Sequence, residues 1–355
     1  MSLLTAGSRG WIGIDLGVQA VKLAQIARAG DELRLNHATF ELDPEFLTTA
    51  LGRPGIAGRA LGQRVRALLE DSDFEGRRIA IALPMPWVDL RSMKIPAVGD
   101  NERRAIIENE LATVFQDDEP REFDFWETRD AGDSAQFQID NIMVLSARCD
   151  TVQGVIDCAR TAGLQCEVLD GLPKSLGRAV DLVERGGDTQ SVGAIDWGYT
   201  GATLCVVRGG EPLFTRYLRD CGFGPMVNAV AAGLGLTHGE AIEVLSRIGL
   251  PSANGGADES ADVQEIAAEL AISTLQSLLE QLNKTLAYLR VQRPHLLPAR
   301  FWLFGGGAMI RNADAFLAHR LQVPVKCWRL QPSDEGGAEA MYGVAAALSA
   351  LRWES

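Results

Sequence analysis

The 355-residue sequence predicts a two-lobed α/β protein with a smaller subdomain inserted into its first lobe. Three observations favour this fold class. An apolar strand that ends in an Asp-x-Gly turn occurs twice, with the turns at residues 15–17 and 196–198. A glycine-rich loop at 305–307 follows another apolar strand. Residues 87–170 contain a separate succession of predicted strands and helices, which indicates a separate structural unit.

Hydrophobic periodicity divides the beginning of the chain into strands and one helix. Apolar runs predict strands over 11–15, 21–26, 33–42 and 78–83, and the first three form a meander. Leucines and valines at helical spacing predict an amphipathic helix over 60–70.

The segment 87–170 is expected to contain two strand-helix-strand units. Its predicted strands are 88–95, 123–127, 139–146 and 166–169, and its predicted helices are 101–114 and 151–162. Asn101 is expected to be the N-cap of the first helix.

The second half begins with a strand over 192–198. The predicted elements that follow are helices 223–234, 238–247 and 262–292, strand 301–304, helix 308–321, strand 323–328 and helix 337–351. We therefore expect lobe I (subdomain 1A) to comprise residues 1–86, 171–188 and 331–355. The inserted subdomain is expected over 87–170, and lobe II (2A/2B) over 189–330.

The two halves align when Asp15 is placed over Asp196. This alignment superposes Ile14 on Ile195, Gly17 on Gly198 and Leu23 on Leu204. Such a repeat predicts a duplicated domain. Because each Asp-x-Gly turn ends the first strand of its copy, the two turns are expected to face a common cleft, where ligands bind preferentially.

Composition excludes several classes of function. The formal net charge of −13 argues against a nucleic-acid-binding protein. No apolar stretch is long enough to span a membrane, and the first residues lack the pattern of a signal peptide, so a cytoplasmic protein is expected. The six cysteines form no C-x-x-C pair and the four histidines no H-E-x-x-H motif, which argues against a zinc site.

The two Asp-x-Gly turns suit phosphate and magnesium. A glycine permits close approach to a phosphate and lets backbone N–H groups point inward. Asp15 and Asp196 could hold Mg²⁺ through water from opposite lobes, because this ion keeps several waters beside one or two carboxylates. Lys22 could reach a phosphate, although a lysine on a strand surface is an equally good interpretation.

The loop of Gly305, Gly306, Gly307 and Ala308 could pack against a base or ribose. It does not match G-x-G-x-x-G, and a Walker A lysine loop is absent from the sequence, so neither a Rossmann nor a P-loop site is expected.

These three loops, in this order and with this duplication, resemble the actin-like ATPase superfamily. Within it the sequence is most similar to the PilM family of type IV pilus assembly proteins, over nearly the whole chain. The motifs that carry the resemblance are residues 12–17 with 21–23, 83–84, 94–96, 107–110, 194–198 with 203–204, and 303–308.

The resemblance implies a duplicated, ribonuclease H-like fold in which residues 87–170 form the 1C subdomain shared with FtsA. It also implies binding of ATP and Mg²⁺. The nucleotide-binding residues that it implies are Asp15, Gly17, Val18, Gln19, Lys22, Asp196, Gly198, Tyr199, Thr200, Gly201, Glu240, Glu243, Gly305, Gly306, Gly307 and Ala308.

The sequence departs from the superfamily pattern at three places. Val18 and Gln19 stand where serine is usual, and Trp197 and Tyr199 are bulky where small residues are common. Glu243 stands where the family's Ala-Glu-x-x-Lys helix carries lysine, and a glutamate there would repel a triphosphate. A partly degenerate pocket with at most weak ATPase activity is therefore expected.

By resemblance, the chain is a scaffold that grips the N-terminal tail of a PilN-like bitopic inner-membrane protein, and ATP binding tunes this grip. The protein would then lie at the inner membrane through its partner. The alternatives are an FtsA-like division ATPase, the cytoplasmic part of a GspL-like secretion protein and a small-molecule kinase. The sequence lacks FtsA's basic amphipathic tail, a membrane span and a recognisable catalytic base.

Overall fold

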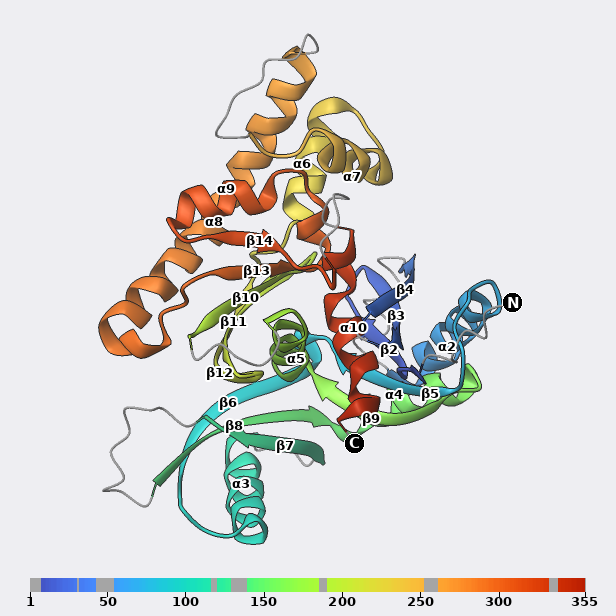
Figure 1. Cartoon of the computed structure of the whole chain (residues 1–355), viewed down its shortest axis with the longest axis vertical. Helices are drawn as coiled ribbons and strands as arrows, with labels where there is room; N and C mark the ends of the chain where they lie inside the picture. The colour runs from blue at the N-terminus through green and yellow to red at the C-terminus, as the bar shows by residue number, and fades with distance from the viewer. Residues whose placement is uncertain are drawn as a thin grey trace.

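The computed structural model describes residues 8–30, 32–42, 54–115, 120–128, 139–184, 190–251, 261–331 and 338–354. Two sheets with the same topology form two lobes, and a third sheet lies beside them (Figure 1). None of the helices in these ranges combines the length and the apolar character that a bilayer span requires.

The first sheet forms lobe I and has the strand order β4-β3-β2-β5-β9, with the short β1 also paired to β3. Strands β2, β3 and β4 are antiparallel, whereas β2, β5 and β9 run parallel. The bounds are Ser8–Arg9 (β1), Ile12–Leu16 (β2), Ala20–Ala29 (β3), Glu32–Glu41 (β4), Arg78–Leu83 (β5) and Gln165–Gly171 (β9). Helices α2 (Pro54–Glu70) and α4 (Cys149–Thr161) cover one face of this sheet through residues such as Leu61 and Val155.

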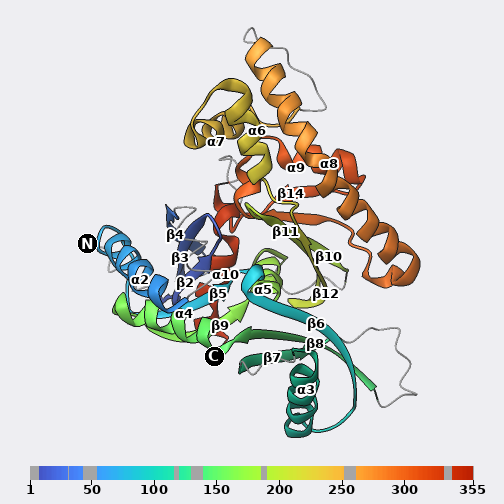
Figure 2. The same ribbon diagram turned by 180° about the vertical axis from the view of Figure 1, so that it is seen from behind.

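The second sheet forms lobe II and repeats this order as β12-β11-β10-β13-β14. Its strands are Val192–Trp197 (β10), Gly201–Arg208 (β11), Glu211–Arg219 (β12), Phe301–Phe304 (β13) and Val325–Cys327 (β14). The accompanying helices are Gly224–Leu234 (α6), His238–Arg247 (α7), Ala261–Gln292 (α8) and Ala313–Leu321 (α9). The identical order and strand directions confirm the duplication predicted from the Asp-x-Gly repeat. Viewed from behind, α6 and α7 lie at the end of lobe II that is far from the third sheet, and the long α8 runs along the lobe (Figure 2).

The third sheet has the order β6-β8-β7 and is antiparallel throughout. Its strands are Val88–Pro96 (β6), Arg121–Glu127 (β7) and Ile139–Arg148 (β8), and helix α3 (Asp100–Val114) covers one face. A small separate core of Ile95, Ile107, Leu111, Ile142 and Val144 holds the helix to the sheet. The chain then returns to lobe I, where β9 pairs with β5. The domain limits drawn from the sequence stay a prediction.

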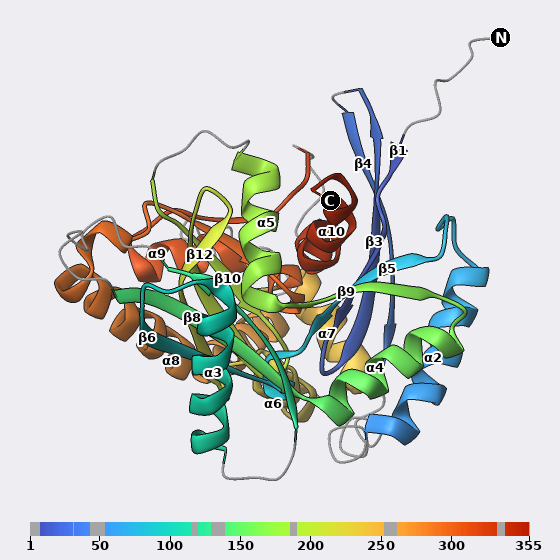
Figure 3. The same cartoon turned by 90° about the horizontal axis from the view of Figure 1, so that it is seen from below.

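Helices α5 (Leu172–Glu184) and α10 (Gly343–Ala350) pack between the sheets of the two lobes (Figure 3). Short 3-10 segments complete the described structure at Met85–Trp87 (η1), Pro294–Leu296 (η2), Gly306–Met309 (η3), Glu339–Tyr342 (η4) and Leu351–Trp353 (η5).

Four expectations about helix ends were wrong, and one helix was missed. Helix α2 begins at Pro54 rather than at residue 60, and α10 begins at Gly343, after a 3-10 segment, rather than at residue 337. The N-cap of α3 is Gly99 rather than Asn101, because the carbonyl of Gly99 accepts the N–H groups of Glu102 and Arg103. The helix expected from residue 308 begins only at Ala313, since Asn312 has a positive φ of 62° that ends the preceding turn. Helix α5 was not predicted from the sequence.

The contact between β2 and α10 requires glycine. A Cβ atom on Gly13 would lie 1.9 Å from the backbone oxygen of Ala345, far inside van der Waals contact. Half of the residues of helix α10 are alanine and all are buried, so its backbone comes close to the sheet.

We expect Gly13→Ala to lower the free energy of unfolding by about 2–3 kcal/mol, because either α10 or β2 must move. Urea unfolding followed by circular dichroism measures this loss. Gly239→Ala in α7 is the matched control, since a Cβ there meets no atom within 4 Å. Equal stability of the two variants would show that α10 can be displaced freely.

Candidate functional site

The two Asp-x-Gly turns adopt the same conformation in the two lobes. The N–H of Gly17 donates to the carbonyl of Ala20, and the N–H of Gly198 donates to the carbonyl of Gly201, both at 3.0 Å. A Cβ on Gly17 would lie 2.6 Å from the same Ala20 oxygen, so this turn needs glycine. The repeat therefore extends from strand order to the geometry of the turns.

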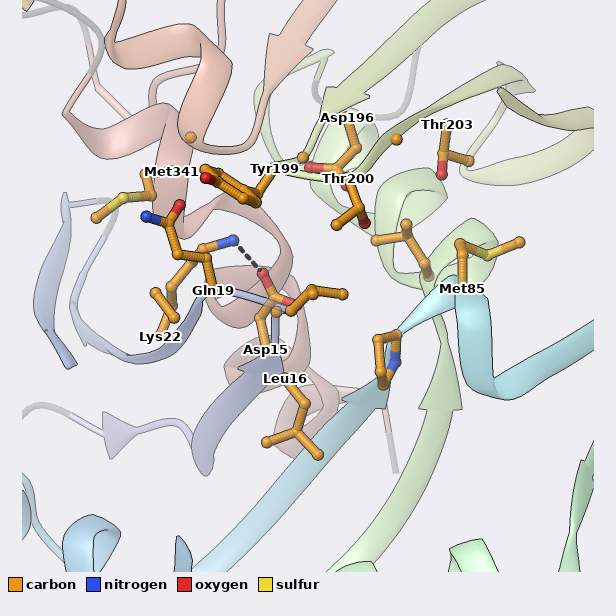
Figure 4. Close-up of a pocket in the computed structure, with 18 of the residues that line it drawn as sticks. Asp15, Leu16, Gln19, Lys22, Met85, Asp196, Tyr199, Thr200, Thr203 and Met341 are labelled. Carbon is orange, nitrogen blue, oxygen red and sulfur yellow. Dashed lines mark hydrogen bonds and ion pairs between the residues drawn. The ribbon is translucent and has the colours of Figure 1, made fainter. Parts of the chain in front are cut away.

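Both turns line one cavity of about 290 Å³ between the lobes (Figure 4). The predicted site residues that line it are Asp15, Gly17, Val18, Gln19, Lys22, Asp196, Gly198, Tyr199, Thr200, Gly201 and Gly306. The structure thus brings together most of the residues that the sequence singled out. Their roles towards a ligand stay predictions.

A buried ion pair lies at the centre of the cavity. The Lys22 ammonium is 2.8 Å from Oδ2 of Asp15, and both side chains are almost fully covered (Figure 4). Burial disfavours the charged form of Lys22. The negative charges of Asp15 and Asp196 together outweigh this effect, so the pKa of Lys22 is raised. Lys22 therefore stays charged and faces inward, against the alternative that it is a surface lysine.

Asp196 has an unusual environment for a carboxylate. Burial raises its pKa to about 6, Lys22 opposes this shift, and the negative charge of Asp15 adds to it. Among the described lining residues, Lys22 is the only cation beside the three carboxylates Asp15, Glu41 and Asp196. The cavity wall is therefore net negative and favours cations.

Magnesium fits these residues. Asp15 and Asp196 are oxygen donors from opposite lobes that line the same cavity, and Mg²⁺ prefers one or two carboxylates with retained waters. A divalent cation would also offset the excess negative charge that a bare phosphate would meet.

A contact between the lobes lies beside the cavity. Nε2 of Gln19 in the first turn lies 2.9 Å from Nε2 of His238 at the start of α7. The His238 ring also packs edge-on against Tyr199, whose ring contacts Phe223 in the same way. Gln19 thus joins lobe I to an aromatic cluster of lobe II.

The third loop supports the second turn and touches the cavity only in part. Gly305 has a φ of 82°, and a Cβ there would lie 2.6 Å from Oδ1 of Asp196. A Cβ on Gly307 would lie 2.3 Å from the Trp197 ring. Of the four residues predicted here, Gly306 lines the cavity, whereas Gly305, Gly307 and Ala308 lie behind it.

Helix α7 turns its two predicted glutamates away from the cavity. Glu240 closes a capping box with Thr237, and Glu243 pairs with Arg247 at 2.6 Å on the exposed side. Ile242 lines the cavity instead. The repulsion expected from Glu243 is therefore not a property of this cavity.

Several lining residues escaped the sequence analysis. They are Leu16, Ala20, Thr39, Glu41, Leu83, Pro84, Met85, Pro86, Leu172, Thr203, Tyr217, Phe223, Ile242, Met309 and Met341. The repeat could have revealed Thr203, which pairs with Asp196 as Lys22 pairs with Asp15. The others come from distant segments without a shared motif.

Two similar lobes that enclose a cavity between twin Asp-x-Gly turns define an actin-like ATPase fold. Among solved structures the chain is similar to ethanolamine utilization protein EutJ from Carboxydothermus hydrogenoformans, at 13% identity and a TM-score of 0.52, covering 98% of this chain and 90% of that one. MreB5 of Spiroplasma citri bound to ADP gives 13% identity and a TM-score of 0.52, with 98% and 97% covered.

A family model gives a more specific assignment than the fold does. A family model described as type IV pilus assembly protein PilM matches residues 13–335, so the chain belongs to the PilM family. It is also similar to the solved PilM-PilN type IV pilus biogenesis complex, at 22% identity and a TM-score of 0.75, covering 97% of this chain and 98% of that one. A search of the curated proteins finds no match.

We expect Asp196→Asn to stabilise the ligand-free protein above about pH 6. The folded-state pKa of Asp196 is raised from 3.8 to about 6, so the wild-type protein loses stability as pH rises through this window. The amide removes that loss, so the variant should exceed the wild type by roughly 1–3 kcal/mol at pH 7.5 and by much less at pH 4. Urea unfolding at both pH values gives the difference. A constant difference would contradict the raised pKa.

Proposed function

We propose that this chain is an actin-like scaffold of type IV pilus assembly that grips the N-terminal tail of a PilN-like inner-membrane protein. The family assignment over residues 13–335 carries the proposal. The similarity to the PilM-PilN complex over nearly the full length of both chains supports this choice of partner. It favours pilus assembly over the division, secretion and kinase alternatives. Through such a partner the protein would lie at the cytoplasmic face of the inner membrane.

The cavity between the lobes supports a second part of the proposal, that Mg-ATP binds there and tunes the grip on the tail. Its walls combine Lys22, which can contact phosphate, with two carboxylates that suit Mg²⁺. The chain's own residues would hold the phosphates by backbone N–H groups of the two turns and by Lys22. When bound, Mg²⁺ would supply charge neutralisation between the phosphates and the acidic wall.

Binding without appreciable hydrolysis agrees with this site. Asp15 is already paired with Lys22, so this carboxylate is not free to take a proton from water. The proposed role of the nucleotide is therefore to hold the two lobes in one arrangement.

We expect Lys22→Met to weaken Mg-ATP binding by about tenfold or more, because a charged contact to phosphate is worth roughly 1.5–3 kcal/mol. Isothermal titration calorimetry in Mg²⁺ measures the effect, and removing Mg²⁺ with EDTA should weaken binding to the wild-type protein as well. Glu243→Gln is the control and should bind like the wild type, because Glu243 faces away from the cavity. The absence of any heat at millimolar Mg-ATP would exclude the nucleotide part of the proposal.

The partner is tested separately with a synthetic peptide of the N-terminal tail of the PilN-like protein from the same organism. We expect the peptide to bind the purified chain, and Mg-ATP to change its Kd. Fluorescence anisotropy of the labelled peptide measures both quantities. A scrambled peptide of the same composition should not bind. Equal affinity for both peptides would exclude the partner.

A further inference from the structure

Trp126 of the third sheet contacts both the second sheet and helix α5. Its indole Nε1 donates to the carbonyl of Pro212, at the start of β12 in lobe II, at 3.0 Å. The ammonium of Lys174, on α5, lies 5.9 Å from the Trp126 ring centre and 2.7 Å from Oε2 of Glu211. We call Trp126, Lys174, Glu211 and Pro212 the Trp126 junction.

Both elements that meet Trp126 also reach the interlobe cavity. The β11–β12 hairpin lines the cavity with Gly201, Thr203 and Tyr217, and reaches the junction at its turn. At ~3.3 Å per residue, the eight residues of β11 span roughly 25 Å. Helix α5 lines the cavity with Leu172, two residues before Lys174. A ligand in the cavity therefore touches both elements that hold Trp126.

The hairpin turn and α5 are in backbone contact. A Cβ on Gly177 of α5 would lie 2.2 Å from the carbonyl oxygen of Gly210 and 3.3 Å from Cδ of Pro212. Contacts this close transmit displacement because the interior has no free volume to absorb it. A shift of the hairpin relative to lobe I must therefore change the junction.

The third sheet is attached to lobe I by different contacts. Strand β6 continues from η1, whose Met85 lines the cavity, and Leu145 of β8 packs on Gly171 at the end of β9. The sheet is thus held by lobe I at one place and by lobe II through Trp126 at another. Its orientation depends on how the two lobes are arranged.

We propose that the Trp126 junction couples the interlobe cavity to the third sheet, so that a nucleotide in the cavity reorients this sheet, and that the partner's tail docks beside this sheet, so that its affinity changes with the nucleotide. The inference rests on the proposed function and supplies the route by which nucleotide acts on the partner. Trp126 is a positioning residue, since it touches neither the cavity nor its ligand.

Trp126→Phe tests the junction, because it keeps the ring and removes the N–H donor. Trp353→Phe is the matched control: its Nε1 also donates one hydrogen bond, to Ser8 Oγ at 3.2 Å, but near the C-terminus of the chain. We expect Mg-ATP to change the tail Kd of the wild type and of Trp353→Phe by about fivefold or more, and that of Trp126→Phe by less than about twofold. The Kd values for Mg-ATP alone and for the tail alone should stay the same in all three proteins. An undiminished nucleotide effect in Trp126→Phe would overturn the proposal.

A ligand-free measurement separates failure of the junction from failure of the proposed function. Hydrogen–deuterium exchange should be several-fold faster over β7 and β12 in Trp126→Phe than in the wild type or Trp353→Phe, because the attachment of the sheet to lobe II is weakened. Unchanged exchange would overturn the junction even if neither nucleotide nor tail binds. Faster exchange without any binding would exclude the proposed function and leave the mechanical coupling supported.

Discussion

The shared charge environment of Asp15, Asp196 and Lys22 is the constraint on which the rest of this molecule depends. Two carboxylates from different lobes line one cavity beside a single lysine, and the negative charge of Asp15 adds to the raised pKa of Asp196. Such an arrangement persists only if both turns are held rigidly. The tight glycine turns, the third loop behind Asp196 and the backbone contact between β2 and α10 all serve that rigidity.

Much of the fold could be predicted from the sequence because the duplication repeats a physical pattern. An apolar strand, an Asp-x-Gly turn and a second apolar strand specify the same hairpin wherever they occur, so Asp15 and Asp196 were correctly paired. Helix α5 was missed although Leu172, Leu176, Ala179 and Val180 recur at helical spacing, so its periodicity could have revealed it.

The site was predicted less completely, and the errors have identifiable causes. Glu240 and Glu243 of α7 were chosen as site residues by resemblance to the family's Ala-Glu-x-x-Lys helix. A helix presents only one face to a cavity, and the face of α7 that lines this one carries Ile242. Residues such as Met309 and Met341 line the cavity from separate segments, so only the tertiary structure brings them together. The departures at Val18 and Gln19 are also clearer in the structure, because Gln19 uses its side chain to contact His238 across the lobes.

The contact between Gly177 and the Gly210 carbonyl has a consequence for how the molecule can move. Two backbones meet there with no side chain between them, in the middle of α5 and at the turn of the β11–β12 hairpin. A rotation of one lobe against the other about this point would require no change of rotamer at Gly177 or Gly210, because neither has a side chain. Because Trp126 donates to Pro212, two residues along the hairpin from Gly210, a rotation at this contact would change the direction of the third sheet.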